Sequence, residues 1–373
     1  MIYKSLGKTS RLISTIGFGC GIGGVKATTA DYSGLYDSLR KSLDLGVNFI
    51  DTSPVYGNGE SEEIVGNVIE TFNDREKLII GSKVLPGKTD YHGVMNSVEH
   101  SLNRLKLNCI DLYQIHWPNP SIPMEETISA MEELVRQEKI KYFGVSNFSF
   151  LEIKKASNIL KKNSLTSVQV EYNFCERSIE NDVLPFCQQN EITTIVYTPL
   201  MRGRMAGTLE QIDLLKKMSK KYSASIAQII LCWITKISSV VVLSNTKNLN
   251  RVDENFKACD IDMSDEDHKI ISNACIPPVQ MVNTRLILES SDLSKTGYKN
   301  LESAINNNMG WTPSPLELSK QMKQGEFLKP IRLRKIFNEN KQGLELLEGK
   351  LRFWAWVVAF GWDKEIPSII WEN

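Results

Sequence analysis

Eight short apolar runs, separated by amphipathic segments, most constrain how this 373-residue chain can fold. Each run is nearly continuous in β-branched or aliphatic residues, as expected for a strand buried on both faces of a parallel sheet. Six of the intervening segments place apolar residues at helical spacing. The runs cover residues 16–20, 47–51, 78–84, 110–116, 141–146, 167–172, 193–198 and 239–244. Strands and helices alternating over about 260 residues predict an α/β fold, a closed (β/α)8 TIM barrel.

An open, doubly wound sheet is the alternative fold. It requires a glycine-rich phosphate loop between the first strand and a helix. Gly19, Gly21 and Gly24 supply the G-x-G-x-x-G spacing, but no clear helix begins there. No acidic residue closes a second strand at the expected distance either. A Rossmann dehydrogenase is therefore only the third interpretation of this chain.

The composition is that of an ordinary soluble protein. Lysine plus arginine equals aspartate plus glutamate at 44 each, so no net charge favours nucleic acid or an anionic membrane. The N-terminus lacks an apolar core of signal-peptide length. The seven cysteines are scattered and form no C-x-x-C pair, which argues against a disulfide framework or a structural metal site. We expect a cytoplasmic protein with no metal, no membrane contact and no DNA partner.

Four polar residues stand where the second, third and fourth runs end. Asp51 and Lys83 lie at the ends of the second and third runs, His116 ends the fourth, and Tyr56 follows in the loop after Asp51. Taken singly, each has an ordinary explanation, such as turn chemistry for Asp51 or solvent exposure for Lys83. In a barrel, however, adjacent strands would deliver all four to the rim where catalytic groups lie.

These four groups suit the protonation of an oxygen that gains negative charge. A phenol is a poor proton donor near neutral pH, and a neighbouring ammonium such as Lys83 would lower the pKa of Tyr56. Asp51 would hold the lysine charged and oriented. A neutral His116 could donate a hydrogen bond to a carbonyl oxygen. The reaction that fits best is the reduction of a carbonyl group by hydride.

The segments that carry these residues resemble the signature segments of the aldo-keto reductases. They are DTSPVYG (51–57), GSKV (81–84), IHWP (115–118) and GVSNF (144–148), in the order and spacing of that family. The resemblance runs from about residue 1 to residue 275. It implies that Asp51, Tyr56, Lys83 and His116 form the catalytic tetrad, with Tyr56 as the general acid in reduction.

The resemblance also implies where the nicotinamide end of a cofactor binds. Ser146 and Asn147 in GVSNF, and Gln169 in VQVEYN, resemble the residues that hold the carboxamide. Tyr197 in VYTPL resembles the aromatic residue that stacks on the nicotinamide ring. The electron-rich face of a tyrosine suits that position.

The phosphate end of the cofactor is expected at the loops after the seventh and eighth strands. Residues 244–255 open a helix and resemble the adenosine-phosphate segment of the family. A helix N-terminus with a nearby arginine can bind the 2′-phosphate of NADPH. Asn245 departs from the common lysine, so we expect NADPH with NADH as the alternative. The residues expected at this end are Arg202, Arg204, Ser244, Arg251, Glu254 and Asn255.

The remainder of the chain is predicted to be a linker and a small α/β domain. Residues 276–310 are expected to form the linker, because 276–283 carries two prolines, and residues 311–373 the domain. The domain resembles the nucleotide-binding fold of the ParB-like and sulfiredoxin-like superfamily, although its Gly349-Lys350-Leu351-Arg352 segment departs from the usual Gly-Glu-Arg-Arg. A phosphate could bind Arg332, Arg334 and Arg352; a role in packing or partner contact is the alternative.

Two functions from different classes follow from this sequence. The first is an NADPH-dependent oxidoreductase that reduces a small aldehyde, ketone or sugar-like carbonyl. The second is a barrel retained as a cofactor-binding sensor or scaffold, whose C-terminal domain binds a nucleotide or a protein partner. Trp117 and residues 22–32 are expected to line the substrate pocket. The sequence leaves the substrate, the direction of the reaction and the oligomeric state open.

Overall fold

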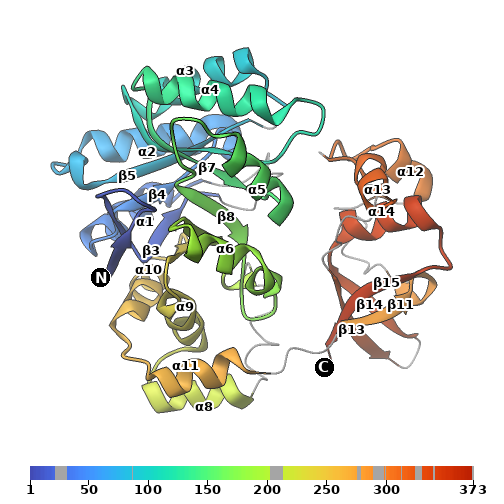
Figure 1. The fold of residues 1–373 in the computed structure, drawn as a ribbon. Helices are drawn as coiled ribbons and strands as arrows, with labels where there is room; N and C mark the ends of the chain where they lie inside the picture. Colours follow the sequence, from blue (N-terminus) through green and yellow to red (C-terminus); the bar gives the residue numbers. More distant parts are fainter. Residues whose placement is uncertain are drawn as a thin grey trace. The chain divides into compact units, whose positions relative to one another are not determined.

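The structure, a computed structural model, divides the chain into two compact units (Figure 1). Unit 1 is Met1–Asn273 and unit 2 is Ala274–Asn373. The residues that the structure describes are 1–21, 32–85, 87–201, 213–274, 279–288, 298, 300–311, 313–323, 330–338 and 341–371.

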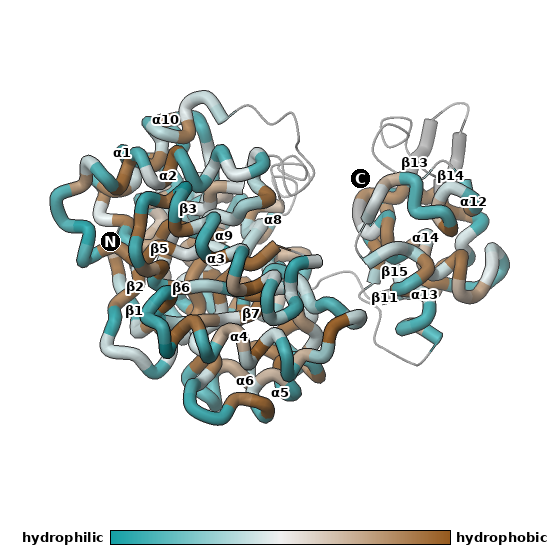
Figure 2. Tube along the Cα trace, turned by 90° about the horizontal axis from the view of Figure 1, so that it is seen from above, coloured by the Kyte–Doolittle hydropathy of each residue, from teal (hydrophilic) through white to brown (hydrophobic). Residues whose placement is uncertain are grey.

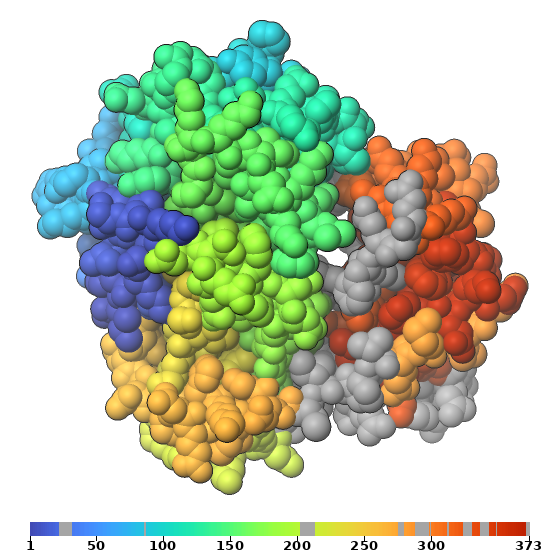
Figure 3. All heavy atoms as spheres, viewed as in Figure 1, coloured from blue at the N-terminus to red at the C-terminus, as the bar shows by residue number. Residues whose placement is uncertain are grey.

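Eight parallel strands close the barrel of unit 1, and β3 pairs with both β4 and β10. Residues from the beginning and the end of unit 1 therefore lie side by side, as the dark blue and yellow surfaces of Figure 3 show. The prediction of a (β/α)8 barrel is confirmed, and the open doubly wound sheet was wrong. The strands are β3 Ile16–Gly19, β4 Phe49–Asp51, β5 Ile79–Val84, β6 Ile110–Ile115, β7 Ile140–Ser146, β8 Ser167–Glu171, β9 Thr193–Tyr197 and β10 Val240–Ser244.

The helices of unit 1 begin where the sequence supplies capping residues. Ser149 and Ser225 each form a capping box. The serine hydroxyl accepts from the backbone N–H of the third helical residue, and the side chain of that residue accepts from the backbone N–H of the serine. Figure 2 shows apolar and polar residues alternating along helices such as α1 and α2, as amphipathic helices on a barrel require. The described helices are α1 Leu35–Asp44, α2 Glu60–Glu70, α3 Tyr91–Leu105, α4 Met124–Arg136, α5 Phe150–Ile159, α6 Val183–Gln189, α8 Asp213–Tyr222, α9 Ile226–Lys236, α10 Leu249–Phe256 and α11 Asp265–Ser272.

A hairpin covers the end of the barrel where its strands begin. The hairpin strands are β1 Tyr3–Ser5 and β2 Leu12–Ser14. Leu6 and Ile13 are fully buried and pack in one cluster with residues from the starts of strands, including Phe49 and Ile79. Because this end is filled with apolar side chains, polar groups can gather only at the opposite, C-terminal end of the strands.

Unit 2 is a five-stranded sheet in the order β11-β15-β13-β14-β12, with helices packed against it. Phe353, Trp354 and Val357 of α14 share a buried core with Ile331 and Leu333 of β13. The elements are β11 Val279–Asn283, β12 Ile287–Leu288, α12 Leu301–Ile305, α13 Pro315–Lys323, β13 Ile331–Asn338, β14 Lys341–Glu348, α14 Lys350–Phe360 and β15 Glu365–Trp371.

The expectation of a linker over residues 276–310 was wrong. Val279–Asn283 forms strand β11, which pairs antiparallel with β15 along its whole length. Tyr298, Val282 and Ile287 are buried in the core of unit 2. Two prolines come directly before the β11 sequence, and because strands tolerate proline where they begin, these prolines did not signal a break. In the described ranges, no helix has the length and apolar character needed to cross a membrane.

Candidate active site

Asp51 and Lys83 form an ion pair inside the barrel. The Nζ atom of Lys83 lies 2.6 Å from Oδ2 of Asp51 and donates to the carbonyl oxygen of Thr52 at 3.0 Å. The exposed fractions of the two residues are 0% for Lys83 and 2% for Asp51. Burial by itself would lower the pKa of Lys83, but Asp51 and Tyr56 raise it above the ordinary value. The lysine is therefore held as an ammonium ion.

Tyr56 lies beside this ammonium at the start of the turn η1 (Tyr56–Gly59). Nζ of Lys83 is 5.2 Å from the centroid of the Tyr56 ring. Burial raises the pKa of Tyr56, and the nearby Lys83 opposes that rise without cancelling it. The expected effect of Lys83 is present in direction, because its charge favours the phenolate, but desolvation is the larger effect and leaves the pKa of Tyr56 above its ordinary value. Tyr56 keeps its proton at neutral pH and can donate it.

Two glutamines hold the second oxygen of the Asp51 carboxylate. Oδ1 accepts from Nε2 of Gln114 at 3.1 Å and from Nε2 of Gln169 at 3.0 Å. Gln169 was expected to hold a nicotinamide carboxamide, whereas its amide faces Asp51 in this structure. Gln114 was not predicted from the sequence. Its signal was present, because alternation along β6 places it on the same side of the strand as His116, two residues later.

His116 is neutral and packed from several sides. Burial, followed by the charge of Lys83, lowers the pKa of His116 well below its ordinary value. The Trp117 ring stacks on the imidazole with centroids 3.7 Å apart, and the Tyr56 ring stands edge-on to it at 5.9 Å. Nδ1 of His116 lies 3.1 Å from Oγ of Ser53. A neutral imidazole next to a phenol can hydrogen-bond a carbonyl oxygen without competing for the proton.

Comparison with known proteins assigns this arrangement to a family. Residues 15–276 match the model of the aldo/keto reductase family, which spans the whole described barrel. The chain belongs to the aldo/keto reductase family. Its members are NAD(P)H-dependent oxidoreductases, and this chain is an enzyme of that class.

Individual relatives agree with this family. The chain is 39% identical to the aldo-keto reductase YhdN of Bacillus subtilis over 220 residues, which cover 57% of this chain and just under two thirds (66%) of that protein. It is 31% identical to the methylglyoxal reductase YeaE of Escherichia coli, covering 65% of this chain and 84% of that protein.

Solved structures show the same barrel. The thermostable aldo-keto reductase Tm1743 matches with a TM-score of 0.68 and 39% identity, covering 73% of this chain and 98% of that one. An aldo-keto reductase from Klebsiella pneumoniae in complex with NADPH matches with a TM-score of 0.65 and 30% identity, covering 73% and 95%. The family match ends at residue 276, so the resemblance of unit 2 to ParB-like domains stays a prediction.

Three of the residues expected at the nicotinamide lie together at the rim of this reductase. Nδ2 of Asn147 donates to the carbonyl oxygen of His116 at 2.9 Å and to Oγ of Ser146 at 3.1 Å. The Tyr197 hydroxyl donates to Oδ1 of Asn147 at 2.7 Å. These bonds join the ends of β6, β7 and β9 into one polar surface beside the imidazole.

The residues expected at the phosphate end are only partly placed. Nδ2 of Asn255 in α10 donates to Oγ of Ser244 at 3.0 Å, which ties that helix to the end of β10. Arg251 is exposed in the first turn of α10, and the carbonyl oxygen of Glu254 accepts from Gln228. The two arginines predicted to reach the pyrophosphate, Arg202 and Arg204, lie outside the described residues.

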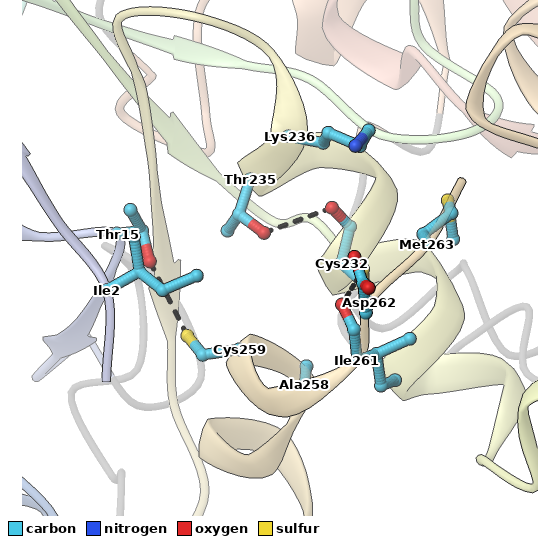
Figure 4. A pocket seen from close by; sticks show the side chains of 10 residues that line it. All are labelled: Ile2, Thr15, Cys232, Thr235, Lys236, Ala258, Cys259, Ile261, Asp262 and Met263. Atoms are coloured by element: carbon cyan, nitrogen blue, oxygen red, sulfur yellow. Dashed lines mark hydrogen bonds between the residues drawn. The ribbon is translucent and has the colours of Figure 1, made fainter. Parts of the chain in front are cut away.

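A separate small pocket, of about 150 Å³, is shown in Figure 4. Thr15 and Cys259 line it and contact each other at 3.4 Å, and Thr235 donates to the carbonyl oxygen of Cys232. Thr15 precedes β3, whereas Asp51 ends the neighbouring strand β4, so the pocket lies at the opposite end of the barrel from the tetrad. Among the described residues, no three His, Cys, Asp or Glu side chains form a group that could hold a metal ion.

The arginines of unit 2 that were expected to bind a phosphate have partners within that unit or are buried. Arg334 pairs with Glu345 across β13 and β14. Nη1 of Arg352 donates to the carbonyl oxygen of Pro330 at 3.0 Å. Arg332 is only 1% exposed. A phosphate site here stays a prediction.

Proposed function

We propose that this chain reduces a small aldehyde, ketone or sugar-like carbonyl to an alcohol, with Tyr56 as the general acid. The observation that carries the proposal is the buried Lys83 ammonium, which contacts Asp51 on one side and faces the Tyr56 ring on the other. An ammonium in that place stabilises the phenolate that remains after the proton has left. It therefore favours proton transfer in the transition state more than in the ground state.

The four side chains divide the work of protonation. A bound nicotinamide cofactor supplies the hydride to the carbonyl carbon. Tyr56 transfers its proton to the carbonyl oxygen, so that a C–H and an O–H bond form while the C=O π bond breaks. His116, neutral because it is buried, donates a hydrogen bond to the same oxygen and orients it. Asp51 keeps Lys83 charged and in place.

The residues at the rim suit the expected cofactor. Ser146 and Asn147 offer a hydroxyl and an amide, which are the groups that recognise a carboxamide. The partly buried ring of Tyr197 offers an aromatic face for the nicotinamide. Exposed Arg251, at the start of α10, suits a 2′-phosphate, so we propose NADPH as the preferred cofactor with NADH as the alternative.

The test begins with cofactor binding and then removes the proton donor. Purified protein should quench or shift NADPH fluorescence on binding and oxidise NADPH when a suitable carbonyl is added. Tyr56→Phe should lower kcat roughly 10²- to 10⁴-fold, the usual contribution of a general acid, while the Kd for NADPH stays nearly constant. Wild-type turnover in that variant would show that Tyr56 is not the acid.

The choice of substrates to test follows from a relative. YeaE, which is 31% identical, is named a methylglyoxal reductase. We therefore place small α-oxoaldehydes first in a panel that also contains simple aldehydes, ketones and open-chain sugars. NADPH oxidation, monitored by absorbance, ranks them by kcat/KM. If no member of the panel is turned over although NADPH binds, the sensor or scaffold function becomes the better account of the barrel.

A further inference from the structure

Ser53 contacts Nδ1 of His116, the imidazole nitrogen other than Nε2. Ser53 is fully buried, and its Oγ lies 3.1 Å from Nδ1 of His116. Trp117 stacks on the same imidazole with an angle of 22° between the rings, and Tyr56 stands almost perpendicular to it at 89°. The ring is thus fixed in orientation by two aromatic neighbours, and its remaining freedom is which nitrogen carries the proton.

The surroundings of Ser53 decide that question. The only other polar contact of Ser53 Oγ among the described residues is the backbone N–H of Val55, at 3.5 Å. This N–H can only donate, so within the described part of the chain the hydroxyl hydrogen has one acceptor in reach, Nδ1 of His116. A buried hydroxyl that left its hydrogen without an acceptor would lose free energy. Nδ1 therefore accepts, and in a neutral imidazole the single proton then resides on Nε2.

We propose that Ser53 is a positioning residue that holds His116 in the Nε2–H tautomer. This inference rests on the proposed function, in which His116 donates to the carbonyl oxygen. Only the Nε2–H tautomer can donate through Nε2; in the other tautomer that nitrogen is an acceptor and would repel the lone pairs of the carbonyl oxygen. Ser53 itself does not touch the substrate and acts only through the imidazole.

The tautomer can be read directly by NMR on the full chain. The protein has four histidines, and comparison with His116→Gln identifies the His116 signals after labelling with ¹⁵N-histidine. The expected spectrum shows Nε2 protonated and Nδ1 as an unprotonated acceptor, and Ser53→Ala should add an Nδ1–H population. Protonated Nδ1 in the wild type, or a spectrum unaffected by Ser53→Ala, would overturn the proposal. This readout does not depend on turnover. It can therefore show that the tautomer assignment is wrong while the proposed carbonyl reduction stands, or the reverse.

Kinetics supply the second readout. Ser53→Ala should lower kcat roughly 2- to 12-fold, the range that corresponds to one lost hydrogen bond between neutral groups, with the Kd for NADPH unchanged. Ser53→Thr, which keeps a hydroxyl, should restore most of the rate and the wild-type tautomer. Ser61→Ala is the matched control, because Ser61 is equally buried and bonds Thr52 at 2.8 Å but is not a described partner of His116. An equal loss of kcat in Ser61→Ala would show that a buried hydroxyl in this region matters only for packing.

Discussion

The ammonium of Lys83 and the carboxylate of Asp51 are stable inside the barrel only as a pair. Lys83→Met leaves the carboxylate buried with two amide donors but no countercharge. We expect a loss of roughly 3–5 kcal/mol in the free energy of unfolding, measured by chemical denaturation. The double variant Asp51→Asn/Lys83→Met should recover much of that loss.

A surface pair provides the control for this measurement. Lys77 contacts Asp74 at 2.7 Å with both side chains at least half exposed. Because water screens that pair, Lys77→Met should leave the unfolding midpoint unchanged. An unfolding midpoint for Lys83→Met equal to that of Lys77→Met would mean that the buried pair does not stabilise the fold.

The pH dependence of catalysis follows from the shifts of Tyr56 and His116. The pKa of Tyr56 is raised above its ordinary value of 10.0, so the phenol stays protonated through the neutral range and loses its proton only at high pH. kcat for reduction should be level from about pH 6 to about pH 9 and then fall, whereas oxidation of the alcohol, which needs the phenolate, should rise over the same limb. Since the pKa of His116 is lowered well below 6.5, no inflection from that residue is expected near neutrality. A limb near pH 6.5 that disappears in His116→Gln would contradict this assignment.

The proximity of Asp51, Lys83 and His116 could be predicted from the sequence. Parallel strands that are neighbours in the chain bring their C-terminal ends to one rim, so polar residues at those ends must lie close together. Alternation along β6 indicates the side of the strand on which Gln114 lies, but the contact of Gln114 with Asp51 and that of Ser53 with His116 could not be predicted in this way. They depend on the stagger of the strands and on side-chain rotamers, which alternation of apolar and polar residues does not report.

At the scale of elements, the turn η1 that carries Tyr56 depends on a glycine with no room for a side chain. Gly57 has a φ of +62°, and a Cβ there would come within 2.6 Å of the Tyr32 ring. Gly87 has a φ of +80° with nothing within 4 Å of its Cβ position, so it shares the backbone conformation without the crowding. Both Gly→Ala variants should lose roughly 1–2 kcal/mol through the backbone. Gly57→Ala should lose roughly 1–3 kcal/mol more through overpacking and should also lower kcat.

Denaturant unfolding and steady-state kinetics of the two variants separate these effects. Equal losses of stability in Gly57→Ala and Gly87→Ala would show that the Tyr32 ring moves aside at no cost.

The helix that follows this turn illustrates the limits of prediction from the sequence. Helix α2, which follows η1, was not among the helices expected from apolar spacing, because its first turn carries three glutamates and its apolar positions begin only at Ile64.

At the scale of the molecule, the family match lies wholly outside the sheet of unit 2. A chain of residues 1–276 contains all eight barrel strands and the tetrad. We expect it to fold and to keep the NADPH affinity and kcat of the full chain, as measured by fluorescence titration and absorbance. A collapse of kcat with NADPH binding retained would instead make unit 2 part of the catalytic apparatus.

The barrel was more predictable than unit 2 for a physical reason. Each barrel strand pairs with its neighbours in the chain, apart from the closing pair β3 and β10, so local patterns report long-range structure. In unit 2, β11 and β15 are adjacent in space but lie at opposite ends of the unit's sequence. No local pattern near residue 279 indicates that partner, which is why the segment was interpreted as a linker.

The pairing of β11 with β15 also bears on the order of events at the ribosome. During synthesis the barrel has all its strands once Ser244 has emerged, and helices α10 and α11 follow. Strand β11 emerges after them and has no partner strand until Glu365–Trp371 has been made. Domains generally fold in the order of their synthesis. For that interval the nascent chain therefore displays a folded barrel followed by an unpaired β-strand, the stage at which we expect a chaperone to bind.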